Sequence, residues 1–217
     1  MVRLENLYKY YRIERLKKIV LRDVNFNFES GRSYGILGIN GAGKSTLMRI
    51  LAGTELPNAG RVRKSVRVSW PLGFAGGLHH GMTGRENIKF VARIYGENVG
   101  QVIEFVEDFA EIGPYIDAPV KTYSSGMVQR VAFGLSMAIN FECYLIDEVM
   151  AVGDARFQAR CQAEFNKRKA VSDIIMISHS MASILEYCQH GLVLADGELH
   201  YFPDVNDAIE TYRKLNM

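Results

Sequence analysis

The stretch that decides the fold is Gly38-Ile39-Asn40-Gly41-Ala42-Gly43-Lys44-Ser45-Thr46. It fits the phosphate-binding pattern G-x-x-x-x-G-K-[ST]. A short, mostly apolar run over residues 32–37 predicts a strand before it, and residues 46–52 carry apolar side chains at helical spacing up to Gly53. Strand, glycine loop and helix are the arrangement that phosphate binding requires, which disfavours a chance glycine turn before a helix.

Each residue type in this phosphate loop has a physical role in holding a phosphate group. Glycines lack a Cβ, so the backbone can wrap closely around an anion. The wrapped N–H groups and the N-terminus of the following helix form an anion site. We expect Lys44 to reach the β- and γ-phosphates of a nucleotide and the Ser45 hydroxyl to face Mg²⁺.

Length and composition favour a packed domain in a reducing compartment. The chain has 217 residues, 48% of them apolar, and its net charge of +2 argues against a dedicated nucleic-acid binder. The three cysteines, Cys143, Cys161 and Cys188, are widely spaced, which indicates free thiols and not a disulfide framework or a zinc site. Residues 1–5 carry charges where a signal peptide is apolar, and no apolar run approaches the roughly 20 residues that span a bilayer. We therefore expect any membrane role to go through a partner.

Two short apolar runs predict buried strands of a mostly parallel sheet. They are Cys143–Ile146, which ends in Asp147-Glu148, and Ile174–Ile177, which ends in Ser178-His179. Polar residues at the carboxyl ends of such strands lie where α/β sheets bind ligands.

These polar residues can complete an ATP site. Asp147 can hold Mg²⁺ from the side opposite Ser45, and Glu148 can orient or deprotonate an attacking water. His179 can donate a hydrogen bond to the γ-phosphate. An acidic pair in a solvated turn and a surface histidine are the alternatives, but the order of these residues after a phosphate loop favours a joint function.

Other patterns place the remaining elements. Alternation predicts strands over residues 2–8, 18–28 and 61–68, and the glycine- and aromatic-rich segment 69–81 is predicted to be a loop that serves contacts. The aromatic and basic cluster over residues 8–12 is either a strand end with solvated charges or an adenine-stacking ring. Asp196-Gly197 predicts a hairpin turn.

Helical patterns fill the middle of the chain. Residues 83–86 form a capping-box sequence that opens a helix with Ile88, Val91 and Ile94 on one side. A second helix is expected to stop at Gly113-Pro114, and a third follows residues 123–126.

In the order of its motifs, nearly the whole chain resembles the nucleotide-binding subunit of ATP-binding cassette (ABC) transporters. The most informative stretch is Tyr123-Ser124-Ser125-Gly126-Met127. In that family it reads Leu-Ser-Gly-Gly-Gln and binds the γ-phosphate of ATP held by the opposite subunit. Ser125 replaces a glycine and Met127 the glutamine, which leaves the backbone role and removes a side-chain donor. A plain N-capped helix is the alternative.

The resemblance implies a role for each matching position. Tyr11, or alternatively Tyr10, stacks on adenine; Gly38, Asn40, Gly41, Ala42, Gly43, Lys44, Ser45 and Thr46 bind ATP; Ser45 and Asp147 hold Mg²⁺; Glu148 is the catalytic base and His179 the γ-phosphate switch; Ser124, Ser125 and Gly126 contact the ATP of the other copy; Asp154 lies at the dimer seam. The family usually carries a glutamine where this chain reads Trp70-Pro71-Leu72-Gly73, so that ligand is assigned to no residue.

The resemblance also implies an α/β fold. It would comprise a P-loop ATPase core with a mostly parallel sheet, an antiparallel β subdomain and a small helical subdomain at about 79–135. All three would belong to a single nucleotide-binding domain over residues 1–217.

Four runs narrow the resemblance to the ATP-binding subunits of capsular polysaccharide exporters: residues 69–77, 82–87, 121–127 and 149–157. This implies an ATP-hydrolysing subunit that drives lipid-linked capsular polysaccharide across the bacterial inner membrane. Its partners would be a second copy in an ATP-dependent dimer and integral membrane permease subunits, without nucleic acid. It would lie at the cytoplasmic face of that membrane.

This interpretation has several alternatives. O-antigen and teichoic-acid exporters share the Val-Gly-Asp-Ala type of run. DNA-repair cassettes need a coiled-coil insertion, for which there is no heptad run. Cassette-type translation factors carry two such domains in one chain, which is too long for 217 residues. Glu148 and His179 disfavour a nucleotide-sensing module that does not hydrolyse ATP.

Overall fold

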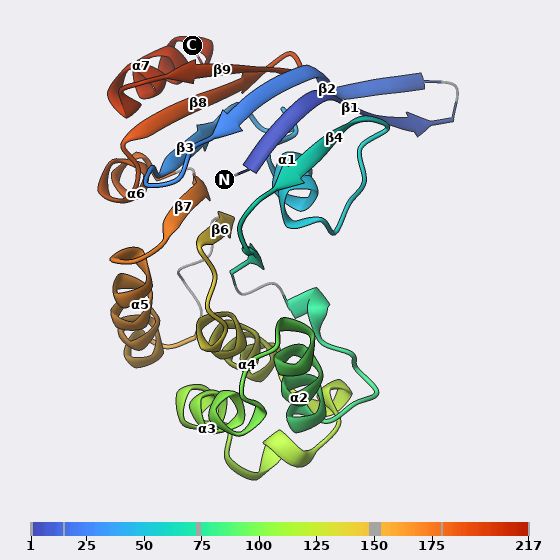
Figure 1. Ribbon diagram of the computed structural model, residues 1–217, viewed down its shortest axis with the longest axis vertical. Helices are drawn as coiled ribbons and strands as arrows, with labels where there is room; N and C mark the ends of the chain where they lie inside the picture. Colours follow the sequence, from blue (N-terminus) through green and yellow to red (C-terminus); the bar gives the residue numbers. More distant parts are fainter. Residues whose placement is uncertain (1, 15, 73–74, 148–152, 179, 217) are drawn as a thin grey trace. The chain divides into compact units, whose positions relative to one another are not determined.

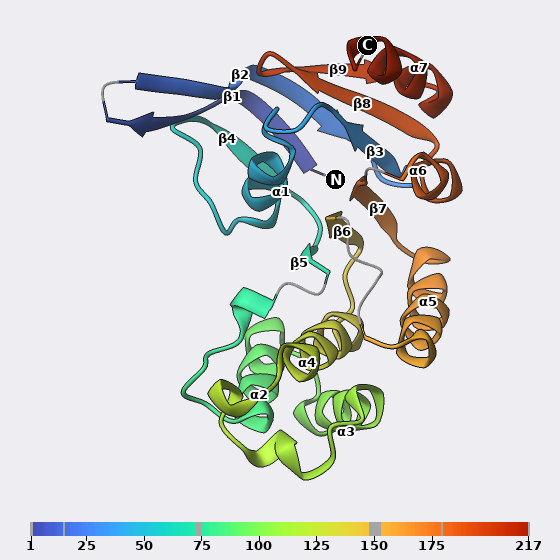
Figure 2. The ribbon, with the colours of Figure 1, turned by 180° about the vertical axis from the view of Figure 1, so that it is seen from behind.

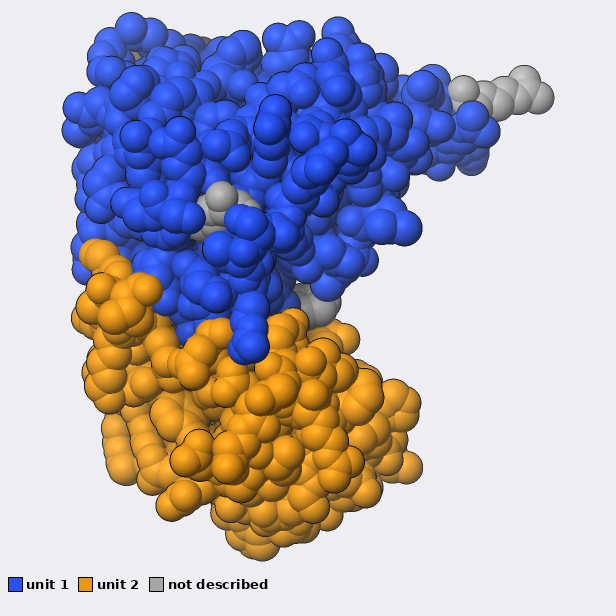
Figure 3. Space-filling view, in the orientation of Figure 1, with its two compact units in different colours: residues 1–71, 141–148, 172–217 blue, residues 72–140, 149–171 orange. Residues whose placement is uncertain are grey.

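The computed structural model describes residues 2–14, 16–72, 75–147, 153–178 and 180–216. The chain divides into two compact units, coloured separately in Figure 3. The first unit comprises residues 1–71, 141–148 and 172–217, and the second comprises residues 72–140 and 149–171. The helical stretch expected at about 79–135 lies inside the second unit.

The first unit is built on a six-stranded sheet (Figure 1). In spatial order its strands are β5 (Val68–Pro71), β6 (Cys143–Asp147), β7 (Asp173–Ile177), β3 (Tyr34–Leu37), β8 (His190–Ala195) and β9 (Glu198–Phe202). Every neighbouring pair is parallel except β8 and β9, which are antiparallel. The hairpin turn between them, Asp196-Gly197, has φ angles of 50° and 84° as a tight turn requires. The predicted mostly parallel sheet is confirmed.

A smaller antiparallel sheet completes the β-structure of this unit. Its order is β2 (Leu16–Phe28), β1 (Val2–Ile13) and β4 (Ala59–Lys64). The single strand predicted over residues 61–68 is wrong, because β4 ends at Lys64 and β5 begins at Val68 in the other sheet. Arg67 marks the change, since its backbone bonds Glu142 and Cys143 at the start of β6. Alternation alone cannot separate two strands that follow one another so closely.

The prediction of a loop over residues 69–81 is wrong at its start, where Ser69, Trp70 and Pro71 belong to β5. This strand is at the edge of its sheet. Proline is tolerated there because an edge strand has a side without ladder hydrogen bonds, where the missing N–H costs none. Ser69 Oγ accepts a hydrogen bond of 2.9 Å from the Leu145 amide at an irregularity in the ladder. The Trp70 ring packs edge-to-face on Phe141.

Three helices belong to the first unit: α1 (Lys44–Ala52), α6 (Met181–Tyr187) and α7 (Val205–Leu215). Helix α1 ends where predicted, with Gly53 in a left-handed conformation. Its side chains Leu47, Met48 and Leu51 enter a core shared with strands of both sheets. Burial of each such side chain contributes about 1.5–3 kcal/mol, which anchors the phosphate loop that precedes the helix. Figure 2 shows α1 from behind.

The second unit is helical. It contains α2 (Gly84–Tyr95), α3 (Val99–Ala110), α4 (Ser125–Ala138) and α5 (Ala155–Lys169), with 3₁₀ turns at Ala75–Gly77, Gly113–Asp117 and Val120–Thr122. Helix α3 ends at Ala110 and not at Gly113-Pro114, because Glu111 adopts the left-handed conformation (φ 50°) that caps it. Among the helices of the described residues, none is long and apolar enough to cross a membrane.

Helix α2 begins as predicted but presents a different face to the interior. The capping box between Thr83 and Glu86 is formed. Ile88 is buried, whereas Ile94 is 60% exposed. The buried side includes Asn87, whose amide group accepts from the His79 amide and donates to the carbonyls of His79 and Thr83. These bonds let a polar residue occupy the interior, which apolar spacing cannot anticipate.

Candidate functional site

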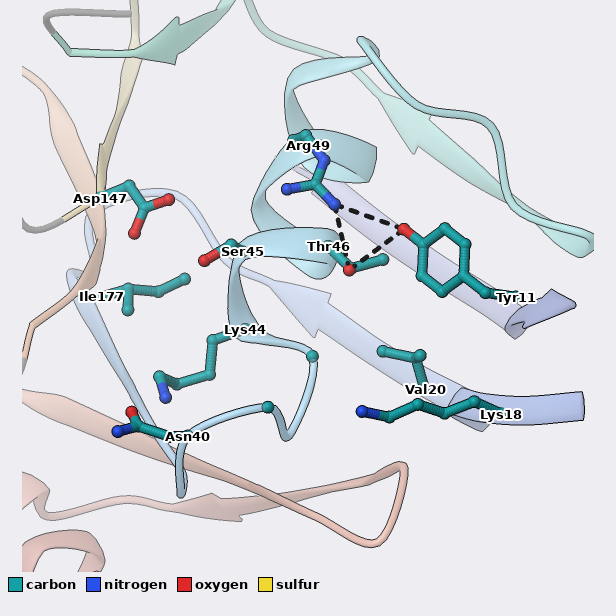
Figure 4. Close-up of a pocket in the computed structure, with 12 residues that line it drawn as sticks. Tyr11, Lys18, Val20, Asn40, Lys44, Ser45, Thr46, Arg49, Asp147 and Ile177 are labelled. Carbon is teal, nitrogen blue, oxygen red and sulfur yellow. Dashed lines mark hydrogen bonds between the residues drawn. The ribbon is translucent and has the colours of Figure 1, made fainter. Parts of the chain in front are cut away.

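A cavity of about 430 Å³ opens in the first unit beside the phosphate loop (Figure 4). Its lining comes from β1, β2, the phosphate loop, α1 and the carboxyl ends of β6 and β7. The lining residues are Tyr11, Lys18, Val20, Asn40, Gly41, Gly43, Lys44, Ser45, Thr46, Arg49, Asp147 and Ile177. The fold thus brings the predicted phosphate ligands, one predicted metal ligand from β6 and the predicted stacking residue to one place.

Glycine is required at two turns of the phosphate loop. Gly43 has a φ of 109°, and a Cβ there would lie 2.2 Å from Val20 Cγ1. A Cβ on Gly38 would lie 2.5 Å from the Leu194 carbonyl oxygen. Gly38 and Ala42 belong to the loop but do not line the cavity. Ala42 packs against the core. A side chain at Gly38 or Gly43 would collide with β8 or β2, so the loop keeps this shape only with glycine at both positions.

Lys44 places a buried ammonium group inside the loop. The residue is 7% exposed, and its Nζ donates to the carbonyl oxygens of Gly38 (2.6 Å) and Ile39 (3.1 Å). Carbonyl oxygens carry only partial negative charge, so a phosphate oxygen is a stronger partner for this cation. The loop therefore fits an anionic ligand.

The opposite wall offers oxygen ligands for a metal ion. Figure 4 shows the Ser45 hydroxyl and the Asp147 carboxylate turned toward the same space. Among the described residues, no group of three or more histidine, cysteine, aspartate or glutamate side chains could hold a metal ion. Two oxygen ligands suit Mg²⁺, which keeps several waters and shares substrate phosphates instead of filling an all-protein cage. Glu148 and His179 lie outside the described residues.

Tyr11, and not Tyr10, lines the cavity, and its hydroxyl is fixed by polar neighbours. It donates to Glu55 Oε1 at 2.6 Å and accepts from Arg49 Nη2 at 3.3 Å. It also lies 3.3 Å from the hydroxyl of Thr46. The Tyr10 ring instead has Lys17 Nζ 4.0 Å from its centroid.

Glu55 is the hub of this network, and the sequence analysis missed it. Burial alone would raise the pKa of its carboxyl group, but hydrogen bonds from Lys9, Tyr11 and Arg49 outweigh burial and lower the pKa from 4.5 to about 2. Glu55 therefore stays ionised and holds Tyr11 in place. No motif includes Glu55; it reaches the site because the turn after α1 brings it against β1.

The remaining predicted site residues belong to the second unit, where they cap helices. Ser124 Oγ accepts from the Met127 amide at the start of α4, and Ser125 and Gly126 form its first turn. Asp154 caps α5: a hydrogen bond from the Phe157 amide (2.9 Å) lowers the pKa of its carboxyl group. Arg130 of α4 forms an ion pair with Asp154 at 2.9 Å. In one copy of the chain these residues are structural, and their roles toward a second copy stay predictions.

Comparisons with known proteins agree with this fold. A model of the ABC transporter family matches residues 21–151. The chain is 46% identical over 216 residues to the polysialic acid transport ATP-binding protein KpsT of Escherichia coli, an alignment that covers 98% of this chain and 96% of that protein. It is 43% identical to the capsule polysaccharide export ATP-binding protein CtrD of Neisseria meningitidis serogroup B, covering 99% of this chain and 100% of that protein.

The structure resembles that of MJ0796, a bacterial ABC transporter cassette solved as a dimer. The TM-score is 0.72 at 20% identity, over 94% of this chain and 99% of that one, a likeness that concerns the fold alone. The family match spans the phosphate loop and the strand that ends in Asp147, which form part of the cavity wall. The chain belongs to the ABC transporter family.

Proposed function

We propose that this chain is the ATP-hydrolysing subunit of an exporter that moves lipid-linked capsular polysaccharide across the bacterial inner membrane. The observation that carries the proposal is its identity of 46% and 43%, over nearly the full length, to proteins named for polysialic acid transport and capsule polysaccharide export. The cavity around Lys44 and Asp147 supplies the ATP site that such a subunit needs.

The proposed site acts on the phosphates of ATP. The backbone of residues 40–46 and the Lys44 ammonium hold the β- and γ-phosphates, and Tyr11 offers its ring to adenine. Ser45 and Asp147 hold Mg²⁺, which when bound neutralises charge on the phosphate oxygens. Glu148 takes the proton of the attacking water, and His179 donates to the γ-phosphate. These roles are assigned from the order in which the motifs occur in the sequence.

A second copy would complete the site. Two chains would pack head to tail, with Ser124–Gly126 of one copy opposite the phosphate loop of the other. The N-terminus of α4 is suited to this because its first amides and its helix dipole favour an anion. ATP would close the dimer, and hydrolysis would open it. Closure would reach the permease through residues 70–81 and the helices that follow, at the cytoplasmic face of the membrane.

The test replaces the protein with its Glu148→Gln variant in the source cell, with the conservative Asp108→Asn variant at an exposed position of α3 as the control. We expect polysaccharide to accumulate inside the cell and the surface to lose its capsule, whereas the control keeps its capsule. The trapped polymer then identifies the substrate.

Other outcomes would overturn parts of the proposal. If the trapped polymer is an O-antigen or a teichoic acid, the proposed exporter role stands and the proposed substrate is wrong. The Glu148→Gln variant could instead keep a normal cell surface and unchanged phosphate release in the presence of the membrane partner. This result would exclude Glu148 as the catalytic base and contradict the proposed function.

A further inference from the structure

A cation from outside the phosphate-loop motif lies in the same cavity. Lys18 of β2 lines it together with Val20, two positions along the strand. Its Nζ lies 3.9 Å from the point where a Cβ on Gly41 would be. Figure 4 shows the ammonium group extending toward the phosphate loop.

The register of the hairpin explains why Lys18 faces the cavity. Lys18 pairs with Tyr11 across β1 and β2, and alternate residues of a strand share a face. Lys18, Val20 and the cavity-lining Tyr11 therefore stand on one side of the hairpin. Lys17 stands on the other side, where its ammonium covers the Tyr10 ring.

Lys9 already has partners in the described structure, in contrast to Lys18. Lys9 Nζ is 2.7 Å from Glu55 Oε1 and donates to the Leu56 carbonyl at 2.8 Å. Lys18 Nζ has no hydrogen bond or ion pair with any residue that the structure describes. Its charge is therefore available to a ligand in the cavity.

The charges of the cavity wall favour an anionic ligand. The lining contains three basic side chains, Lys18, Lys44 and Arg49, against one described carboxylate, Asp147. Arg49 is already paired with Glu55 at 2.9 Å. Lys18 and Lys44 both lie beside the loop, and a phosphate chain that bridges them is the polyanion that this wall fits.

We propose that Lys18 is a further nucleotide-binding residue whose ammonium pairs with a phosphate oxygen of the nucleotide held by the phosphate loop. The inference rests on the proposed ATP site. It adds a contact from the β1–β2 hairpin, so the element that offers Tyr11 to the base also offers a charge to the phosphates.

The test measures the affinity of the full-length chain for MgADP, which binds without turnover, and for adenosine, which has no phosphate. The variants are Lys18→Ala, the conservative Lys18→Arg and the matched control Lys17→Ala on the opposite face. We expect Lys18→Ala to weaken MgADP binding about 3- to 10-fold at low salt, as loss of one partly exposed ion pair does. Lys18→Arg should restore most of the affinity, and Lys17→Ala should leave it unchanged.

Two further readouts separate a phosphate contact from a structural effect. The deficit of Lys18→Ala should shrink at high salt, because ions screen an exposed pair. Adenosine affinity should be the same in all four proteins.

The inference is overturned if Lys18→Ala binds MgADP as tightly as Lys17→Ala, or if it loses adenosine affinity by the same factor. A Lys44→Ala variant keeps the two proposals distinct. If Lys44→Ala loses MgADP and Lys18→Ala does not, the proposed function stands and the role of Lys18 falls. If the wild-type chain binds no MgADP, both fall.

Discussion

At the scale of single residues, the cavity depends on side chains that the phosphate-loop motif does not contain. Glu55 gathers Lys9, Tyr11 and Arg49 around one carboxylate, whose side chain is only 18% exposed. Because the Tyr11 hydroxyl also contacts Thr46, the Tyr11 side of the cavity is tied to the helix that follows the phosphate loop. A change at Glu55 should therefore be felt both in stability and at the nucleotide.

Replacing Glu55 with Gln should lower the free energy of unfolding by about 1–2 kcal/mol at pH 7, because three charge-assisted hydrogen bonds lose the anion. The folded-state pKa of Glu55 is lowered from 4.5 to about 2. Its contribution is therefore complete above pH 4.5 and is lost as the pH falls toward 2.

Urea unfolding of both proteins between pH 7 and pH 3 measures this difference. Glu210→Gln is the control, since Glu210 makes a single exposed pair with Lys214 and its loss should change stability little. A deficit of Glu55→Gln that stays constant down to pH 3 would contradict the account.

Motif residues could be predicted from the sequence because their chemistry is local. Lys44, Ser45 and Asp147 each follow a short pattern whose geometry is set by adjacent strands and loops, and all three line the cavity. Glu55 and Lys18 could not be found in this way, because they reach the site through the pairing of β1 with β2 and the turn after α1. Such contacts join residues far apart in the chain and leave no pattern in it.

At the scale of elements, caps were predicted better than faces. The capping box at Thr83 and the end of α1 at Gly53 are formed as expected, since each depends on residues within one turn. The buried face of α2 was wrong because Asn87 is satisfied inside by distant backbone groups. The break between β4 and β5 was not predicted because apolar and polar residues alternate in both strands.

Removing the α2 cap gives a test at this scale. Thr83→Ala should lower the free energy of unfolding by about 1 kcal/mol, because it leaves the Glu86 amide without its acceptor. Thr83→Ser keeps the hydroxyl and should stay close to wild type. Thermal unfolding of the three proteins measures this, and equal stability of Ala and Ser variants would show that the box does not support the helix.

At the scale of the whole molecule, the two stretches proposed to contact ATP lie in separate units of one chain. The first unit contains the phosphate loop, and the second begins α4 with Ser124, Ser125 and Gly126. In the proposed dimer these halves meet across two chains, so association should depend on the nucleotide between them.

The Glu148→Gln variant should therefore form dimers only with MgATP, because ATP bound at the seam is not hydrolysed. Size-exclusion chromatography with and without MgATP measures the state. The double variant Lys44→Ala/Glu148→Gln should stay monomeric under both conditions. A dimer of equal strength without nucleotide would contradict an ATP-filled seam.

The most direct test of the central claim is the rate of phosphate release from MgATP by this chain with the proposed membrane partner, compared between wild type and Lys44→Ala. Lys44 contributes a buried charged donor worth about 1.5–3 kcal/mol per bond, so its loss should slow turnover at subsaturating ATP by about 10- to 100-fold or more. Lys17→Ala, on the face of β2 away from the cavity, should release phosphate at the wild-type rate. If Lys44→Ala also releases phosphate at the wild-type rate, the cavity in Figure 4 is not the site of ATP hydrolysis.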